Sequence, residues 1–148
     1  MKYRKLNPSD IEEFIQLRIK QIVEEGSKVN IDVIKNSKLY IESGIKNGEF
    51  LSWVALDKNK IIATSALSIV SVVPFGSNKN GKIGILSCMY CEPKYRRMGI
   101  ASELLKKITV EARENACYSI QVTGSNVGVL LYDDFGFNGN KNFRQLVL

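Results

Sequence analysis

The chain has 148 residues, 45% of them hydrophobic, which is a common size for one globular domain with a sizeable core. Its net charge is +6, and it contains no histidine, which excludes a Ser/His/Asp triad and any histidine general base. The first residues form no apolar signal region, and no apolar run is long enough to span a membrane. We therefore expect a single domain, residues 1–148, in the cytoplasm and without a membrane partner.

The N-terminal residues predict a short strand over 3–6 and then a helix. Ser9 and Glu12 have the spacing of a capping box at the start of this helix. Arg18 falls inside the apolar stripe of the helix, so its side chain either extends past its neighbours to solvent or directs a charge into a pocket. The stripe itself consists of Ile11, Phe14, Ile15, Ile19 and Ile22.

A second helix is predicted over about residues 32–46, and the sequence then becomes typical of β-structure. Residues 50–56, 61–73 and 83–91 are rich in β-branched and aromatic residues, with turn-forming residues between them. They predict an antiparallel meander.

The remaining residues alternate between helix and strand. We predict a helix over 100–114, a strand over 118–123, a helix over 126–135 and a strand over 143–148. This order requires a crossover connection and at least one parallel pair of strands.

The three cysteines, an odd number, argue against a disulfide scaffold. Cys88 and Cys91 have the spacing of a redox or zinc pair, but in a strand residues three apart face opposite sides. We therefore expect no metal site.

The segment from Glu92 to Ala101 joins a predicted strand to a predicted helix and has the features of an anion site. The first turn of a helix has N–H groups without intrahelical partners, which stabilise an anion. The small residues Gly99 and Ala101 let a phosphate approach these groups, and Arg96 and Arg97 add positive charge. Alone the pattern is weak, because it arises often by chance.

A second motif, Leu131 through Phe137 with Tyr132 and Gly136 inside it, follows about thirty residues later. With both motifs in this order, the chain resembles the GNAT N-acetyltransferase superfamily, closely over residues 84–137 and by element order elsewhere. The resemblance implies an α/β (α+β) GNAT fold, in which a mixed, mostly antiparallel sheet of six to seven strands is flanked by about four helices. It also implies a splayed parallel pair of strands at the cofactor site.

The resemblance places the pyrophosphate of acetyl-CoA at the first motif. Met89 and Cys91 are expected to bind the pantetheine arm through main-chain groups at a bulge, with the Met89 N–H polarising the thioester carbonyl. The family's usual asparagine and alanine are replaced here by Ser125 and Gly128, so Asn126 is the remaining candidate amide. The full set of implied cofactor residues is Met89, Cys91, Arg96, Arg97, Met98, Gly99, Ile100, Ala101, Ser102, Ser125 and Asn126.

Tyr132 is the candidate catalytic residue. Its phenol can protonate a leaving thiolate, whereas the alternative is a helix tyrosine that only packs against the sheet. No spacing selects a general base among Tyr40, Glu49, Tyr90 and Glu92, and a water chain is a further alternative.

The expected function is transfer of an acetyl group from acetyl-CoA directly to an amine of a small molecule or peptide in a ternary complex. The alternative is a non-catalytic acyl-CoA-binding sensor or interaction module. Basic residues are scattered, and acetyl-CoA accounts for a local basic patch, so no nucleic-acid partner is expected. A homodimer is expected only at the level of the family.

Overall fold

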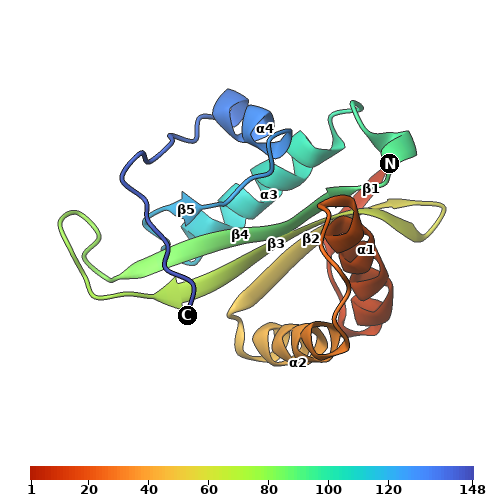
Figure 1. Cartoon of the computed structure of the whole chain (residues 1–148), viewed down its shortest axis with the longest axis horizontal. Helices are drawn as coiled ribbons and strands as arrows, with labels where there is room; N and C mark the ends of the chain where they lie inside the picture. The colour runs from red at the N-terminus through yellow and green to blue at the C-terminus, as the bar shows by residue number, and fades with distance from the viewer.

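A five-stranded sheet with helices on both faces forms the molecule (Figure 1). The computed structural model describes all residues from 1 to 148. The strands lie side by side in chain order, and every neighbouring pair is antiparallel except the last, which is parallel. They are β1 (Lys2–Lys5), β2 (Phe50–Asp57), β3 (Lys60–Ser71), β4 (Lys82–Cys91) and β5 (Ile120–Gln121).

Figure 1 shows two helices below the sheet and two above it. Below lie α1 (Ile11–Glu24) and α2 (Ile31–Asn47), and above lie α3 (Ile100–Glu114) and the short α4 (Gly128–Phe135). Two 3₁₀ turns, η1 (Pro8–Asp10) and η2 (Pro93–Tyr95), precede α1 and follow β4. None of the helices combines the length and the hydropathy that crossing a membrane requires.

Each face of the sheet has its own apolar core. Beneath it, the stripe of α1 packs on β2 and β3, and Phe14 meets Phe50 edge to face with ring centroids 6.2 Å apart. Above it, Leu104, Leu105 and Ile108 of α3 are fully buried. This apolar face fixes α3 against the sheet, and with it the position of the helix start next to the end of β4.

The start of α1 differs from the prediction. A capping box at Ser9 and Glu12 is wrong, because the chain first forms η1 and α1 begins only at Ile11. The Asp10 carboxylate accepts a hydrogen bond from the Asn7 N–H at 2.7 Å and two from the Arg4 guanidinium. The capping box therefore lies at Asn7 and Asp10 of η1, and the Asp10 carboxylate also binds Arg4 of β1.

The predicted number of strands, six to seven, is also wrong. Residues 143–148 form no strand, and Phe143, Leu146, Val147 and Leu148 are exposed. β5 is shorter than the predicted 118–123. A strand is stable only when its backbone groups find a partner, and residues 143–148 pair with none here.

Candidate active site

β4 and β5 separate from each other part-way along their length. Their pairing joins Gly84 to Ile120 and Ile85 to Gln121, whereas β4 continues to Cys91. The N–H of Glu92 donates to Ile62 of β3, and residues alternate in direction along a strand. The N–H groups of Met89 and Cys91 therefore lie on the edge of β4 that faces away from β3, where β5 has already diverged.

A β-bulge lies in this part of β4. Thr64 pairs with Tyr90 and Ala66 with Ser87, so two residues of β4 oppose the single Ser65 of β3. Cys88 has a positive φ of 52°, and its carbonyl accepts a hydrogen bond of 2.8 Å from the Thr64 hydroxyl. The bulge redirects the main chain at Met89, as bulges near functional sites commonly do.

The segment between η2 and α3 forms a run of unpaired backbone donors. Arg97 and Gly99 both have left-handed φ angles, of 65° and 78°. No backbone or side-chain group accepts a hydrogen bond from the N–H groups of residues 97–102. A Cβ atom at Gly99 would meet nothing within 4 Å, so the space in front of these groups is open. The arrangement fits a phosphate, because oriented N–H groups at a helix start stabilise an anion.

The side chains of residues 97–102 differ in exposure. Arg97 and Met98 are exposed, and Arg97 makes no ion pair. Ile100 is buried and anchors α3, so only its backbone faces the open space, while Ala101 and Ser102 are half-buried.

Arg96 is held by its neighbours. Its guanidinium donates to Glu24 of α1 at 2.7 Å and to the Cys91 carbonyl at 2.8 Å, and lies over the Tyr90 ring at 5.6 Å. These contacts raise the pKa of Arg96, chiefly through Glu24. Arg96 therefore ties the end of β4 to α1.

Tyr132 lies on α4 with its ring buried against Phe137, at a centroid distance of 5.4 Å, and close to Gly124. Its hydroxyl donates to no group of the protein, and Asn78 Oδ1 is the one fully buried side-chain polar atom without a partner. The Tyr132 hydroxyl therefore reaches the surface. Burial of the residue raises the pKa of Tyr132, and Glu25 adds to the rise. The phenol thus keeps its proton at neutral pH.

Ser125 and Asn126 lie at the start of α4. The Ser125 hydroxyl accepts a hydrogen bond from the Gly128 N–H at 3.1 Å, so it caps the helix. Asn126 is exposed and makes no hydrogen bond within the protein.

The four candidate bases form two groups, Tyr90 and Glu92 at the end of β4, and Tyr40 and Glu49 on α2 and just after it. Glu92 forms an ion pair with Lys20, and Glu49 accepts from the Asn47 amide at 3.1 Å. Tyr40 packs edge to face on Phe50, and Tyr90 lies beneath Arg96. None of them has a hydrogen bond to Tyr132.

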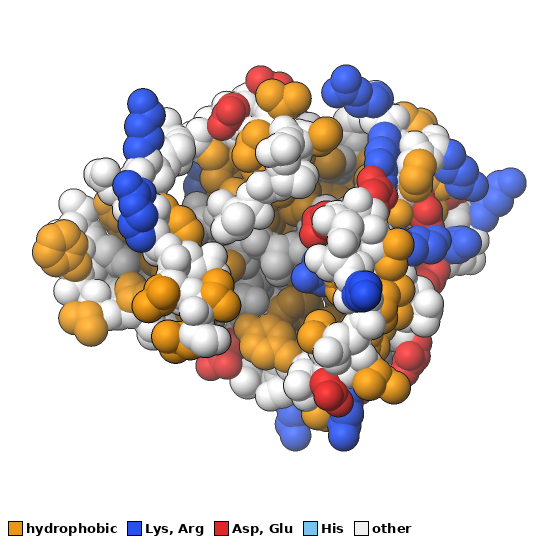
Figure 2. All heavy atoms as spheres, viewed as in Figure 1, with side chains coloured by type: hydrophobic (Ala, Val, Ile, Leu, Met, Phe, Trp, Pro, Cys, Tyr) orange, Lys and Arg blue, Asp and Glu red, His pale blue; other side chains and the backbone are white.

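A polar stripe, formed by Arg18 and Gln21 of α1 and by Glu25 at the end of the helix, faces the bulge. Gln21 accepts from Arg18 at 2.9 Å and donates to Glu25 at 3.0 Å, and its amide nitrogen lies 3.5 Å from the Met89 carbonyl oxygen. Figure 2 shows that the molecular surface is hollowed over the middle of the sheet, between α1 and the C-terminal segment. The only signal in the sequence was the position of Arg18 within the apolar stripe.

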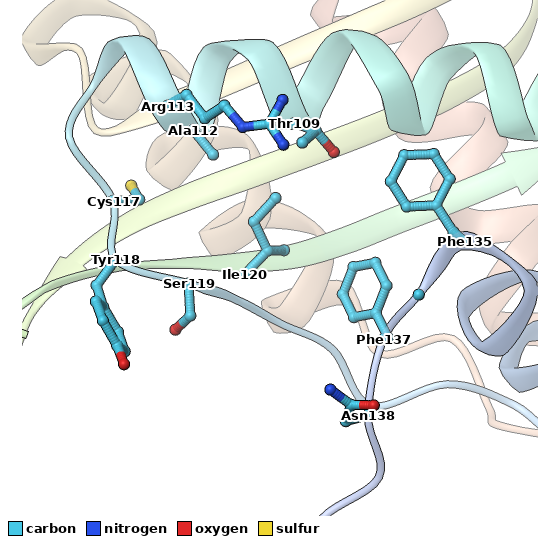
Figure 3. Close-up of a pocket in the computed structure, with 11 residues that line it drawn as sticks. Thr109, Ala112, Arg113, Cys117, Tyr118, Ser119, Ile120, Phe135, Phe137 and Asn138 are labelled. Carbon is cyan, nitrogen blue, oxygen red and sulfur yellow. The ribbon is translucent and has the colours of Figure 1, made fainter. Parts of the chain in front are cut away.

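A cavity of about 390 Å³ lies elsewhere, at the beginning of β5. Figure 3 shows Phe135 and Phe137 on one side of it, Ile120 and Tyr118 along another, and Arg113 of α3 above. The cavity lies at the C-terminal end of α3, whereas Gly99 precedes its N-terminal end, so the cavity is separate from the run of N–H groups.

Comparisons with known proteins identify the family of the chain. The model of the acetyltransferase (GNAT) family matches residues 17–137. The chain therefore belongs to the GNAT family of acetyltransferases. A comparison with curated proteins found no match.

Solved structures with the same fold include one that is similar in sequence. A protein from Clostridium acetobutylicum, described as a predicted acetyltransferase with acetyl-CoA, is 32% identical; the match covers 99% of this chain and 95% of that one, with a TM-score of 0.94. A GCN5-related N-acetyltransferase from Ralstonia eutropha is 18% identical, with coverages of 99% and 97% and a TM-score of 0.85. Glucosamine-6-phosphate N-acetyltransferase from Arabidopsis thaliana is 20% identical, with coverages of 99% and 97% and a TM-score of 0.73.

Proposed function

We propose that this protein transfers an acetyl group from acetyl-CoA to a primary amine, directly and within a ternary complex. The observation that carries the proposal is the run of unpaired N–H groups over residues 97–102 in front of an open space. It lies at the end of the strand whose bulge turns the Met89 main chain toward the gap between β4 and β5. The acetyl-CoA in the similar Clostridium acetobutylicum structure supports the same cofactor here.

The residues of the cradle have distinct roles in this proposal. The N–H groups of residues 97–102 bind the pyrophosphate, and Arg97 supplies a full positive charge. Ser125 acts by capping α4 rather than by direct contact, which leaves Asn126 as the exposed amide of that loop.

The reaction itself requires three things from the chain. Acetyl-CoA supplies the activated acetyl group as a thioester. The N–H of Met89 stabilises negative charge on the carbonyl oxygen, and the N–H of Cys91 helps to orient the substrate. The Tyr132 hydroxyl delivers its proton to the sulfur, and the proton that the neutral amine loses passes to solvent, from which the phenol regains one. Overall a C–N bond replaces a C–S bond, and no oxidant is needed.

The test combines binding with turnover. Acetyl-CoA should raise the melting temperature, and thiol release should then be measured over a panel of amines, peptides and polyamines. Stabilisation with thiol release from at least one acceptor supports the transferase. No stabilisation at millimolar acetyl-CoA contradicts any acyl-CoA site, and stabilisation without release from any acceptor supports the alternative, a non-catalytic binding module.

A further inference from the structure

The polar stripe of α1, formed by Arg18, Gln21 and Glu25, has a charged group at each end and an amide between them. These residues are three and four positions apart, so their side chains lie one above another on the same face of the helix. The Gln21 carboxamide uses its oxygen for Arg18 and its nitrogen for Glu25, at 2.9 Å and 3.0 Å. It therefore holds a cation and an anion at a fixed separation.

Neither charge of the stripe is neutralised by the protein. The other charged side chains of α1 all have partners elsewhere in the protein. Three form ion pairs: Glu12 with Lys38, Lys20 with Glu92 and Glu24 with Arg96. Glu13 accepts a hydrogen bond from the Ile61 N–H. Arg18 and Glu25 form no ion pair, and each has a side-chain hydrogen bond only with Gln21. A half-buried guanidinium without an anion has lost part of its hydration and gained no ion pair, so an external anion would bind it favourably.

The stripe faces the proposed reaction centre. The Gln21 amide nitrogen lies 3.5 Å from the Met89 carbonyl oxygen, at the bulge of β4. The charges of the stripe affect the pKa of two neighbouring residues. Burial raises the pKa of the Cys88 thiol; Arg18 opposes this rise and Glu25 adds to it. Burial also raises the pKa of Tyr132, and Glu25 adds to that rise. The charges of Arg18 and Glu25 thus act on the bulge at which the Gln21 amide lies.

We infer that the acceptor carries a primary amine and, several bonds away, an anionic group. Glu25, an anion, binds the amine end, and Arg18, a cation, binds the anionic end. The inference rests on the proposed acetyl transfer and adds the class of acceptor. Gln21 sets the spacing, since it separates the two charges by the length of one carboxamide and two hydrogen bonds. Such pairing favours one charge pattern and rejects the reverse one.

Three amines of matched length test the assignment: 5-aminopentanoate, pentylamine and 1,5-diaminopentane. Thiol release should give a kcat/KM for 5-aminopentanoate at least about tenfold above that for pentylamine, as expected for one charge-assisted hydrogen bond, and 1,5-diaminopentane should be the poorest. Arg18→Gln should reduce the difference to within about twofold, while Arg18→Lys should keep most of it. Glu25→Gln should raise KM for all three amines and leave their order unchanged.

The control is Lys35→Gln, which removes the same charge from the exposed face of α2 and should not change the order. Melting temperatures of all variants with acetyl-CoA show whether each remains folded and binds it. Equal rates for the three amines, or a preference that survives Arg18→Gln in a folded variant, would overturn the assignment alone. Turnover confined to amines without an anionic group would do the same, whereas no thiol release from any amine overturns the proposed transfer as well.

Discussion

The Arg96 guanidinium lies 2.7 Å from the Glu24 carboxylate, so an ion pair joins the end of α1 to the segment that precedes α3. Both side chains are more than one-third exposed, at 38% and 47%. An exposed pair of this kind contributes little to stability, about 0–1 kcal/mol. Its importance is that it fixes the direction of a guanidinium which the family resemblance assigns to the pyrophosphate.

Glu24→Gln should release Arg96 and strengthen acetyl-CoA binding. We expect the dissociation constant, measured by calorimetry at low salt, to fall by about twofold to tenfold, because a competing anion is removed. The control is Glu12→Gln, which breaks a different α1 ion pair, the one with Lys38. If Glu24→Gln instead weakens binding while Glu12→Gln does not, Glu24 positions Arg96 for the cofactor rather than competing with it.

Two glycines provide a matched pair for the phosphate cradle. Gly99 and Gly48 both have φ of 78°, and a Cβ atom at either would meet nothing within 4 Å. Replacement by alanine should cost each about 1–2 kcal/mol of unfolding free energy, because an L-residue is strained in this conformation. Only Gly99→Ala should weaken acetyl-CoA binding, by about tenfold or more, since its methyl group enters the space in front of the N–H groups. Equal affinity in the two variants would show that the pyrophosphate binds elsewhere.

Tyr132→Phe should separate catalysis from binding. The hydroxyl makes no hydrogen bond within the protein, so its loss should leave the melting temperature and acetyl-CoA affinity nearly unchanged. The turnover number should fall by about a hundredfold, if proton delivery to the thiolate limits the rate. A parallel loss of affinity and turnover would identify Tyr132 as structural.

The protonation of Tyr132 predicts how turnover depends on pH. Burial and Glu25 raise the pKa of Tyr132 above its usual value of 10. The phenol therefore stays protonated at neutral and mildly alkaline pH, and no decline in turnover up to about pH 9 should depend on Tyr132. A basic limb near pH 9 that is present in the wild type and absent from Tyr132→Phe would contradict this assignment.

The sequence predicted those elements whose signals are local. The helix over 100–114 is confirmed at both ends, because an apolar stripe follows a glycine that can adopt a left-handed φ. The meander from residue 50 to residue 91 is also confirmed, because its signal is local too: stretches rich in β-branched residues are separated by turn residues. The unpaired N–H groups of residues 97–102 follow directly from the helix start.

Features that depend on distant residues could not be predicted. Arg96 and Glu24 are 72 positions apart, so nothing near Arg96 in the sequence reveals its partner. The capping box falls on Asn7 and Asp10 of η1 instead of Ser9 and Glu12, and Arg4 on β1 holds the Asp10 carboxylate in place. The apolar residues of 143–148 have the composition of a strand, but strand formation also requires a neighbouring edge, which composition does not encode.

Two phenylalanines test the absence of that last strand. Phe50 is 3% exposed in the core beneath the sheet, whereas Phe143 is 64% exposed. Phe50→Ala should lower the unfolding free energy by about 3–5 kcal/mol, and Phe143→Ala by less than about 0.5 kcal/mol, measured by urea denaturation of the dilute protein. A loss above about 1.5 kcal/mol for Phe143→Ala would mean that residues 143–148 pack against the domain in solution.

Asp10 should make the stability of the fold depend on acidic pH. Its hydrogen bonds with Arg4, at 2.5 Å and 3.0 Å, hold the pKa of the Asp10 carboxyl below its usual value. Because the folded state prefers the ionised form, this contribution is complete above the unfolded pKa of about 3.9 and is lost as the pH falls through the folded value.

Asp10→Asn should therefore lower the unfolding free energy at pH 7 by about 1.5–3 kcal/mol, the range for hydrogen bonds to a charged group. The difference from the wild type should narrow as the pH is lowered from 4 to 2, as measured by urea denaturation at each pH. Asp134→Asn, on the exposed face of α4, is the control and should follow the wild type throughout. A difference for Asp10→Asn that stays constant down to pH 2 would show that shape rather than charge stabilises the turn before α1.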